Sequence, residues 1–217
     1  MKKIILIMMY VMFMVIGTAN VYADNSKDYQ KALNKEKKEK MKEYKKGKWE
    51  LFSSSRTLEV ALLKHYDMLE ASGEDTQEIS GTVTKCKSKN VGKQMAVNNA
   101  CISYAQMAGS ELKGRILSDI SADASEGTNE FDHFYSAYER LVQKEIRNEM
   151  KESYTIIRTN NDGTYEMMVF FIVSESAASK ARIRALNNAL KESEAAQMHA
   201  EKISEFVQAG FETQVTE

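Results

Sequence analysis

Two cysteines are the first residues in this sequence whose type and spacing suggest chemistry. Cys86 and Cys101 are the only cysteines of the 217-residue chain. In an oxidising compartment they could form a disulfide, and its loop of about 15 residues would contribute up to about 3 kcal/mol on the chain-entropy estimate. The alternative is a pair of buried thiols that act as small apolar side chains. The sequence leaves both interpretations open.

A lysine-rich segment near the N-terminus is the second candidate. Residues 24–48 hold ten lysines and five acidic residues, a net charge of +5, whereas residues 49–217 carry a net charge of −8. A basic arm on an acidic body is a candidate contact for anionic lipid headgroups or an acidic polymer. The alternative is a solvated helix face that Glu–Lys pairs stabilise, such as Glu36 with Lys40. The candidate contact residues are Lys31, Lys35, Lys38, Lys42, Lys45 and Lys46.

The three histidines have no partner at the spacing of metal ligands. His65 lies among the apolar positions of a predicted helix, so we expect it to be buried and hydrogen-bonded. His133 follows Asp132 at a helix start, and His199 lies on the polar side of the last helix. We expect neither of them to be catalytic.

Other catalytic and binding motifs are missing as well. The acidic residues between Asp119 and Asp132 do not have the spacing of a calcium-binding EF-hand loop. Ser53-Ser54-Ser55 lacks the nucleophile elbow of hydrolases, and no phosphate-binding loop or CxxC pair occurs. We therefore expect no catalytic residue, no cofactor and no metal ion.

The first 23 residues have the pattern of a secretory signal peptide. Lys2 and Lys3 precede an unbroken apolar run over residues 4–16, and Val21-Tyr22-Ala23 fits the small-x-small cleavage rule. A membrane span needs about 20 residues, and this run is shorter. We expect cleavage after Ala23 and export of the remainder, without a lipid anchor because no cysteine lies at the cleavage point. The alternative is an uncleaved N-terminal anchor.

Helix and strand patterns alternate along the rest of the chain, which contains no proline. Asn160-Asn161-Asp162-Gly163 predicts a β-hairpin, and the strand after it is apolar on both faces, which favours a central position. The long helix after the first clear strand has the apolar line Met95, Ile102, Ala105, Leu112, Ile116 and Ile120. The predicted helices are 26–46, 56–71, 91–122, 130–152 and 175–209, and the predicted strands are 49–52, 78–86, 154–159 and 164–173.

These elements predict an α+β fold. We expect a small, mainly antiparallel sheet of about four strands, packed with long helices and preceded by a charged N-terminal helix. The expected organisation is a signal peptide over residues 1–23, a basic helix over 24–48 and one α+β domain over 49–217.

The element order from residue 78 onward resembles the domain of the LPP-twenty-like envelope proteins of Gram-negative bacteria. The segments that carry the resemblance are ISGTVTKCKS, AVNNACISYAQMAGSELKGRI and YTIIRTNNDGTYEMMVFFIV, and they cover roughly half of the expected mature chain. Members of that family are usually lipoproteins, and this chain lacks the lipidated cysteine. The resemblance implies a role in the envelope, sometimes near surface or flagellar assemblies, and it supplies no catalytic residues.

Together these features predict an exported, non-enzymatic cell-envelope protein that acts through protein or surface contacts. We expect it in the periplasm or at the outer envelope, with no integral membrane span after cleavage. Nucleic acid is disfavoured as a partner because no aromatic residues are interleaved with the lysines. The alternatives are a periplasmic module that binds a small ligand between the sheet and the Ala-rich last helix, and an exported hydrolase.

Overall fold

The computed structural model describes residues 27–71, 75–119 and 128–209. The chain divides into two units, residues 1–48 and residues 49–217. The predicted signal peptide and its cleavage point after Ala23 lie outside the described residues. The described part of the first unit is a helix over residues 27–46, which ends where the Gly47 amide donates a hydrogen bond to the Glu43 carbonyl oxygen (2.8 Å).

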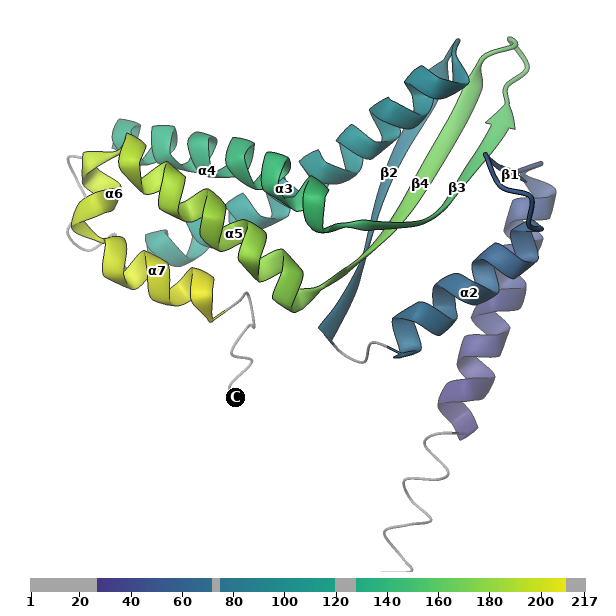
Figure 1. The fold of residues 1–217 in the computed structure, drawn as a ribbon, viewed down its shortest axis with the longest axis horizontal. Coiled ribbons are helices and arrows are strands. Elements are labelled where there is room, and N and C mark those ends of the chain that lie inside the picture. The colour runs from purple at the N-terminus through teal and green to yellow at the C-terminus, as the bar shows by residue number, and fades with distance from the viewer. Residues whose placement is uncertain (1–26, 72–74, 120–127, 210–217) are drawn as a thin grey trace, which may run out of the picture. The chain divides into compact units, whose positions relative to one another are not determined.

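The second unit contains a four-stranded antiparallel sheet in the order β1-β3-β4-β2 (Figure 1). The β4 strand lies between β3 and β2, and Met167 and Val169 at its middle are fully buried. This confirms the predicted central position of the apolar strand. The strands are β1 (Glu50–Leu51), β2 (Thr76–Cys86), β3 (Lys151–Thr159) and β4 (Tyr165–Ser174).

The predicted hairpin joins β3 to β4. Gly163 has a φ of +77°, a left-handed conformation that glycine adopts without steric cost. The Asp162 carboxylate accepts hydrogen bonds from the amide and hydroxyl of Thr164 (3.1 and 2.5 Å), and Lys85 Nζ lies 2.7 Å from it. These contacts hold the pKa of Asp162 well below its usual range, through its hydrogen bonds with Lys85 first and Thr164 second.

Long helices surround this sheet. Figure 1 shows α3 crossing the sheet and continuing beyond it, where α4 and α5 run beside its second half. The α2 helix packs on the opposite face of the sheet, through His65 and its neighbours. The helices are α2 (Leu58–Ala71), α3 (Lys89–Asp119), α4 (Thr128–Glu149) and α5 (Glu175–Ala189).

Gly81 allows α3 to lie directly on β2. A Cβ atom at this position would lie 2.0 Å from the Ala96 carbonyl oxygen and 2.5 Å from the Ala100 nitrogen, both in the backbone of α3. Only a residue without a side chain fits such an approach. The small residues that the sequence places in β2 and α3 therefore set the distance between the sheet and its covering helix.

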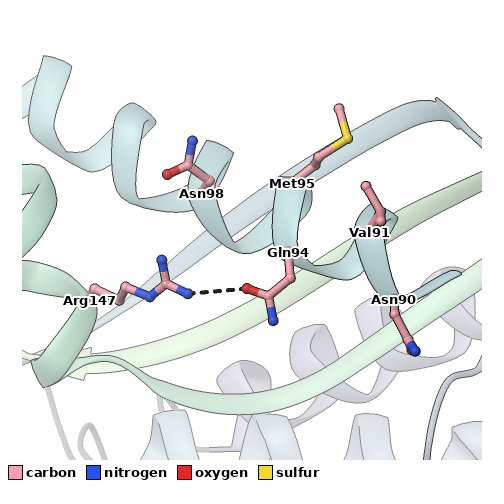
Figure 2. A pocket seen from close by; sticks show the side chains of 6 residues that line it. All are labelled: Asn90, Val91, Gln94, Met95, Asn98 and Arg147. Atoms are coloured by element: carbon pink, nitrogen blue, oxygen red, sulfur yellow. Dashed lines mark hydrogen bonds between the residues drawn. The ribbon is translucent and has the colours of Figure 1, made fainter. Parts of the chain in front are cut away.

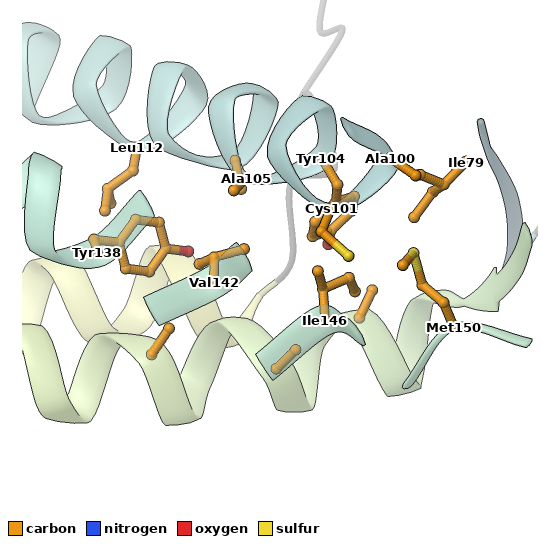
Figure 3. Packing of buried hydrophobic residues seen from close by; sticks show 14 of the residues in the cluster. Ile79, Ala100, Cys101, Tyr104, Ala105, Leu112, Tyr138, Val142, Ile146 and Met150 are labelled. Atoms are coloured by element: carbon orange, nitrogen blue, oxygen red, sulfur yellow. The ribbon is translucent and has the colours of Figure 1, made fainter. Parts of the chain in front are cut away.

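The main core fills the space between this face of the sheet and the helices beyond it. Figure 3 shows Leu112 and Tyr138 at one end of the cluster and Ile79, Ala100 and Met150 near the sheet. All five are buried. In β2, Ile79, Gly81 and Val83 are buried on the side that meets α3, and the residues between them are more exposed. This alternation holds as far as the register shift between Val83 and Cys86.

The C-terminal region differs from the single helix predicted over residues 175–209. The helix α5 ends at Ala189 and is followed by a 3-10 turn, η2 (Leu190–Glu192), and by α6 (Glu194–Met198) and α7 (Ala200–Gln208). The break occurs because Ser193 adopts an extended conformation, with φ −142° and ψ 118°, and its hydroxyl accepts a hydrogen bond from the Ala196 amide. Serine competes with the helix backbone in this way.

The boundary between α4 and β3 also lies earlier than predicted. The helix predicted to reach residue 152 ends at Glu149, and the strand begins at Lys151 rather than at residue 154.

The fold class is confirmed: the protein is α+β, with a small antiparallel sheet packed against long helices. Among the described residues, no helix combines the length and apolar character that a membrane crossing requires.

Candidate functional site

The lysines of helix 27–46 are on its solvent-exposed surface. All six predicted contact residues, Lys31, Lys35, Lys38, Lys42, Lys45 and Lys46, are exposed. Lys31 lies 3.1 Å from Asp28 and Lys35 lies 3.9 Å from Glu39, one turn along the same helix. Lys40 makes a third such pair, with Glu43 at 3.5 Å. The helix thus presents a row of cations, some of which are held by acidic neighbours.

The two cysteines are buried free thiols. Cys86 Sγ donates to the Tyr165 carbonyl oxygen (3.3 Å) and packs against Gly92 in the first turn of α3. Cys101 is nine residues further along that helix, about 13 Å along its axis. Because the Cα atoms of a disulfide lie at most about 7 Å apart, a bond between Cys86 and Cys101 would require β2 to slide along α3.

His65 is the centre of a polar cluster that was not predicted from the sequence. Its Nε2 lies 2.5 Å from Glu78 Oε2 on β2, and its Nδ1 lies 3.0 Å from Ser153 Oγ on β3. Glu152 pairs with Phe171 and Tyr154 pairs with Phe170, so Ser153 is the extra residue of a β-bulge. The bulge directs Ser153 toward α2.

Serine, histidine and carboxylate are connected in series here, as in serine hydrolases, but the ring nitrogens are exchanged, because the serine contacts Nδ1 and the carboxylate contacts Nε2. In the tautomer with its proton on Nε2, the imidazole donates a hydrogen bond to Glu78 and accepts one from the Ser153 hydroxyl at Nδ1. However, His65 is only 1% exposed, and the rings of Tyr66, Tyr154 and Phe170 surround it at centroid distances of 5.2 to 6.2 Å. The ring is enclosed by protein, so the cluster is suited to fastening α2 to the sheet. The expectation that His65 is buried and hydrogen-bonded is confirmed.

The other histidines are not brought together. His133 is exposed on α4, and His199 lies between α6 and α7, with its ring 6.2 Å from that of Phe131. Of the acidic residues between Asp119 and Asp132, Asp132 is exposed, with its carboxylate 3.5 Å from Lys113 Nζ. Within the described residues, no group of histidine, cysteine or acidic side chains is arranged to hold a metal ion.

A second polar cluster lies inside the helical part of the core, around Arg182. This side chain of α5 is completely buried, donates to the Tyr104 hydroxyl (2.7 Å) and forms an ion pair with Glu175. Burial opposes its charge, but the hydrogen bonds with Glu175 and Tyr104 keep its pKa raised. Burial raises the pKa of Tyr104 and of Tyr138 as well. The only sign of this cluster in the sequence is an arginine among the alanines of α5.

A surface groove lies between the first half of α3 and the end of α4 (Figure 2). It has a volume of about 480 Å³, and Figure 2 shows Arg147 pointing at Gln94, to whose Oε1 it donates (3.2 Å). Met95, predicted on the buried line of its helix, is instead 45% exposed here. The lining residues are Asn90, Val91, Gln94, Met95, Asn98 and Arg147.

This groove is a different place from the one predicted for a small ligand. The alternative of a ligand-binding module placed a pocket between the sheet and the Ala-rich helix, whereas the groove lies between α3 and α4. The alanines of α5, such as Ala178, Ala181 and Ala185, are fully buried in the core.

The chain matches no protein family, and no curated protein or solved structure is similar enough to it to count as a match. The resemblance to LPP-twenty-like envelope proteins therefore stays a prediction from the sequence.

Proposed function

We propose that the protein is exported and acts in the cell envelope, without catalysis, through contacts with an anionic surface or with another protein. The observation that carries this proposal is the exposure of all six predicted contact lysines on helix 27–46. The signal-peptide pattern and the resemblance to LPP-twenty-like proteins support a periplasmic or outer-envelope location. Attachment is through folded contacts rather than a lipid anchor.

The ion pairs within the helix leave the lysines available to a partner. The side chains of Lys31 and Lys35 are 78% and 77% exposed although each lies near an acidic residue. Pairs this exposed contribute about 0.2–1 kcal/mol, whereas each lysine near an anionic membrane gains about 1 kcal/mol. A surface that neutralises several lysines at once outcompetes the pairs within the helix.

Binding to lipid vesicles tests this proposal directly. The chain from Asp24 onward is mixed with neutral phosphatidylcholine vesicles or with vesicles that also contain anionic phosphatidylglycerol, and the bound fraction is measured by co-sedimentation. We expect binding to the anionic vesicles only, weakened by salt because added ions screen the charges. Replacing Lys31, Lys35, Lys38 and Lys42 by glutamine should abolish it.

A matched variant removes the same number of positive charges from the second unit. Lys64, Lys87, Lys144 and Lys191 are all exposed and lie outside helix 27–46. Their replacement by glutamine should leave vesicle binding unchanged. Equal binding to neutral vesicles, or equal losses in both variants, would count against a role for the lysine helix.

The proposed location has its own test. Fractionation of the producing cells should recover the protein outside the cytoplasm, and N-terminal sequencing of that form should begin at Asp24. Recovery of the uncleaved chain in the cytoplasm would exclude the envelope function, whatever the vesicles show.

A further inference from the structure

Arg147 differs from three other arginines of the second unit in what its guanidinium binds. Arg140, Arg158 and Arg184 each have a nitrogen within 3.3 Å of a glutamate oxygen. Within the described part of the chain, Arg147 instead donates only to the neutral Gln94 amide. Since a guanidinium has five N–H donors, most of those on this exposed side chain remain for a ligand.

A row of amide side chains runs along α3 beside Arg147. Asn90, Gln94 and Asn98 are spaced four residues apart, so they share one face of the helix at intervals of about 6 Å. Gln143 of α4 donates to Asn98 Oδ1 (3.1 Å), but α4 ends before it reaches the level of Asn90. Asn90 makes no side-chain hydrogen bond to any described residue. Amides offer both donors and acceptors, as the peptide backbone does.

Two exposed apolar side chains complete the groove. Val91 is 55% exposed and Met95 is 45% exposed, one turn apart on α3 (Figure 2). Their exposed surface offers a ligand an apolar contact beside these polar groups. Methionine also adapts its shape to different apolar partners.

We propose that this groove binds an extended peptide segment that carries a carboxylate. The Arg147 guanidinium holds the carboxylate through charge-assisted hydrogen bonds. The amides of Asn90 and Asn98 pair with peptide N–H and C=O groups, and an apolar side chain of the peptide lies on Val91 and Met95. The row from Asn90 to Asn98 spans about 12 Å, the length of about four extended residues.

Charge complementarity selects this occupant over a neutral one. The second unit carries a net charge of −8, so an acidic peptide is repelled by most of its surface. The Arg147 guanidinium forms no ion pair with a carboxylate of the described chain. It therefore attracts an acidic group at this point of the surface. This inference goes beyond the proposed envelope function and is independent of the lysines of helix 27–46.

The test is an NMR titration of the side-chain amide signals of Asn90, Gln94 and Asn98. The probe is a pool of terminally blocked tetrapeptides with one fixed glutamate and randomised apolar neighbours, and its control is the same pool with glutamine in place of glutamate. We expect the glutamate pool to shift these signals and to bind about tenfold more tightly than the glutamine pool.

Variants of two arginines on the same helix identify the residue responsible. Arg147→Ala should remove the preference for glutamate, whereas Arg140→Ala, which removes an exposed guanidinium paired with Glu192, should retain it. Unchanged signals elsewhere in the spectrum show that each variant is folded. The lysine variants of helix 27–46 should bind the peptides as the unmodified protein does, which separates this test from the vesicle experiment.

Three results would overturn the inference. They are the absence of shifts at these amides up to about 1 mM peptide, equal binding of the two pools, and a glutamate preference that survives Arg147→Ala. Polygalacturonate provides a carboxylate polymer without peptide bonds. If it shifts the same signals while the peptide pool does not, the ligand is an acidic glycan and the peptide assignment is wrong.

Discussion

His65 and Glu78 join a helix to the sheet through one short hydrogen bond. The His65 Nε2 atom on α2 lies 2.5 Å from Glu78 Oε2 on β2, and the other ring nitrogen lies 3.0 Å from Ser153 on β3. The imidazole is 1% exposed, whereas the Glu78 side chain is 40% exposed. One buried ring thus connects three elements of the chain, and its partner carboxylate keeps contact with water.

Replacing His65 by alanine should destabilise the protein by about 2–4 kcal/mol. The change leaves a cavity among Tyr66, Tyr154 and Phe170 and removes both hydrogen bonds of the ring. Urea denaturation measures the loss. His133→Ala is the matched control, because His133 is exposed and its loss should cost no more than about 0.5 kcal/mol. Equal effects of the two changes would show that the His65 cluster does not fasten α2.

The local patterns of this sequence predicted its elements because each depends on near neighbours. The strand pattern over residues 78–86 predicted β2, and the Asp162-Gly163 pair predicted the hairpin. The His65 cluster depends on a different kind of information. His65 and Ser153 are 88 residues apart, and a β-bulge directs the serine toward the histidine. No periodicity along the chain predicts that these two residues contact each other.

The lysines of the candidate site were predictable because they depend on the local sequence, whereas the groove was not. The uneven charge along the chain indicated the lysines. Their exposure follows from the strong hydration of ammonium groups. The groove was missed because helical spacing places Met95 on the apolar line of α3 without showing that α4 and the sheet leave it uncovered. Arg147 likewise matters because it forms no ion pair with a described carboxylate. This depends on the folded arrangement of its neighbours and cannot be read from the sequence.

Gly81→Ala should destabilise the protein by about 3 kcal/mol or more. The new methyl group would lie 2.0 Å from a carbonyl oxygen of α3, so the helix and β2 would have to separate. Gly114 in α3 is the matched control, because a Cβ atom there meets nothing within 4 Å. Gly114→Ala should stabilise the helix by up to about 1 kcal/mol. Thermal unfolding of both variants checks this, and a harmless Gly81→Ala would mean that α3 does not lie directly on β2.

Two buried tyrosines should respond differently to loss of their hydroxyl groups. The Tyr104 hydroxyl accepts a hydrogen bond from Arg182, so Tyr104→Phe should cost about 1.5–3 kcal/mol. The buried Tyr138 hydroxyl makes no hydrogen bond to any described residue, so Tyr138→Phe should be neutral or stabilising. Chemical denaturation of the two variants measures the difference. A larger loss for Tyr138→Phe would refute the assignment of partners.

The two thiols should remain separate in the isolated protein. Cys86 and Cys101 are buried, and burial raises the pKa of the Cys101 thiol, so the folded protein should react slowly with iodoacetamide. After denaturation without reductant, mass spectrometry should show two alkyl groups per chain. A chain that accepts none until a reductant is added would instead contain the Cys86–Cys101 disulfide.

Tyr135 should make the protein lose stability at alkaline pH. Burial first, and the nearby Asp132 carboxylate second, raise the pKa of Tyr135 from 10.0 to about 12. The folded state therefore keeps a proton that the unfolded state releases above pH 10, so stability is complete below pH 10 and falls as the pH rises toward 12. The loss should reach about 1–2 kcal/mol once solvent screening is allowed for. Urea denaturation of the protein and of Tyr135→Phe between pH 8 and 12 measures it, because the variant has no phenol to titrate and should lose less. Parallel pH curves for the two proteins would show that Tyr135 ionises as freely in the folded state as in the unfolded chain.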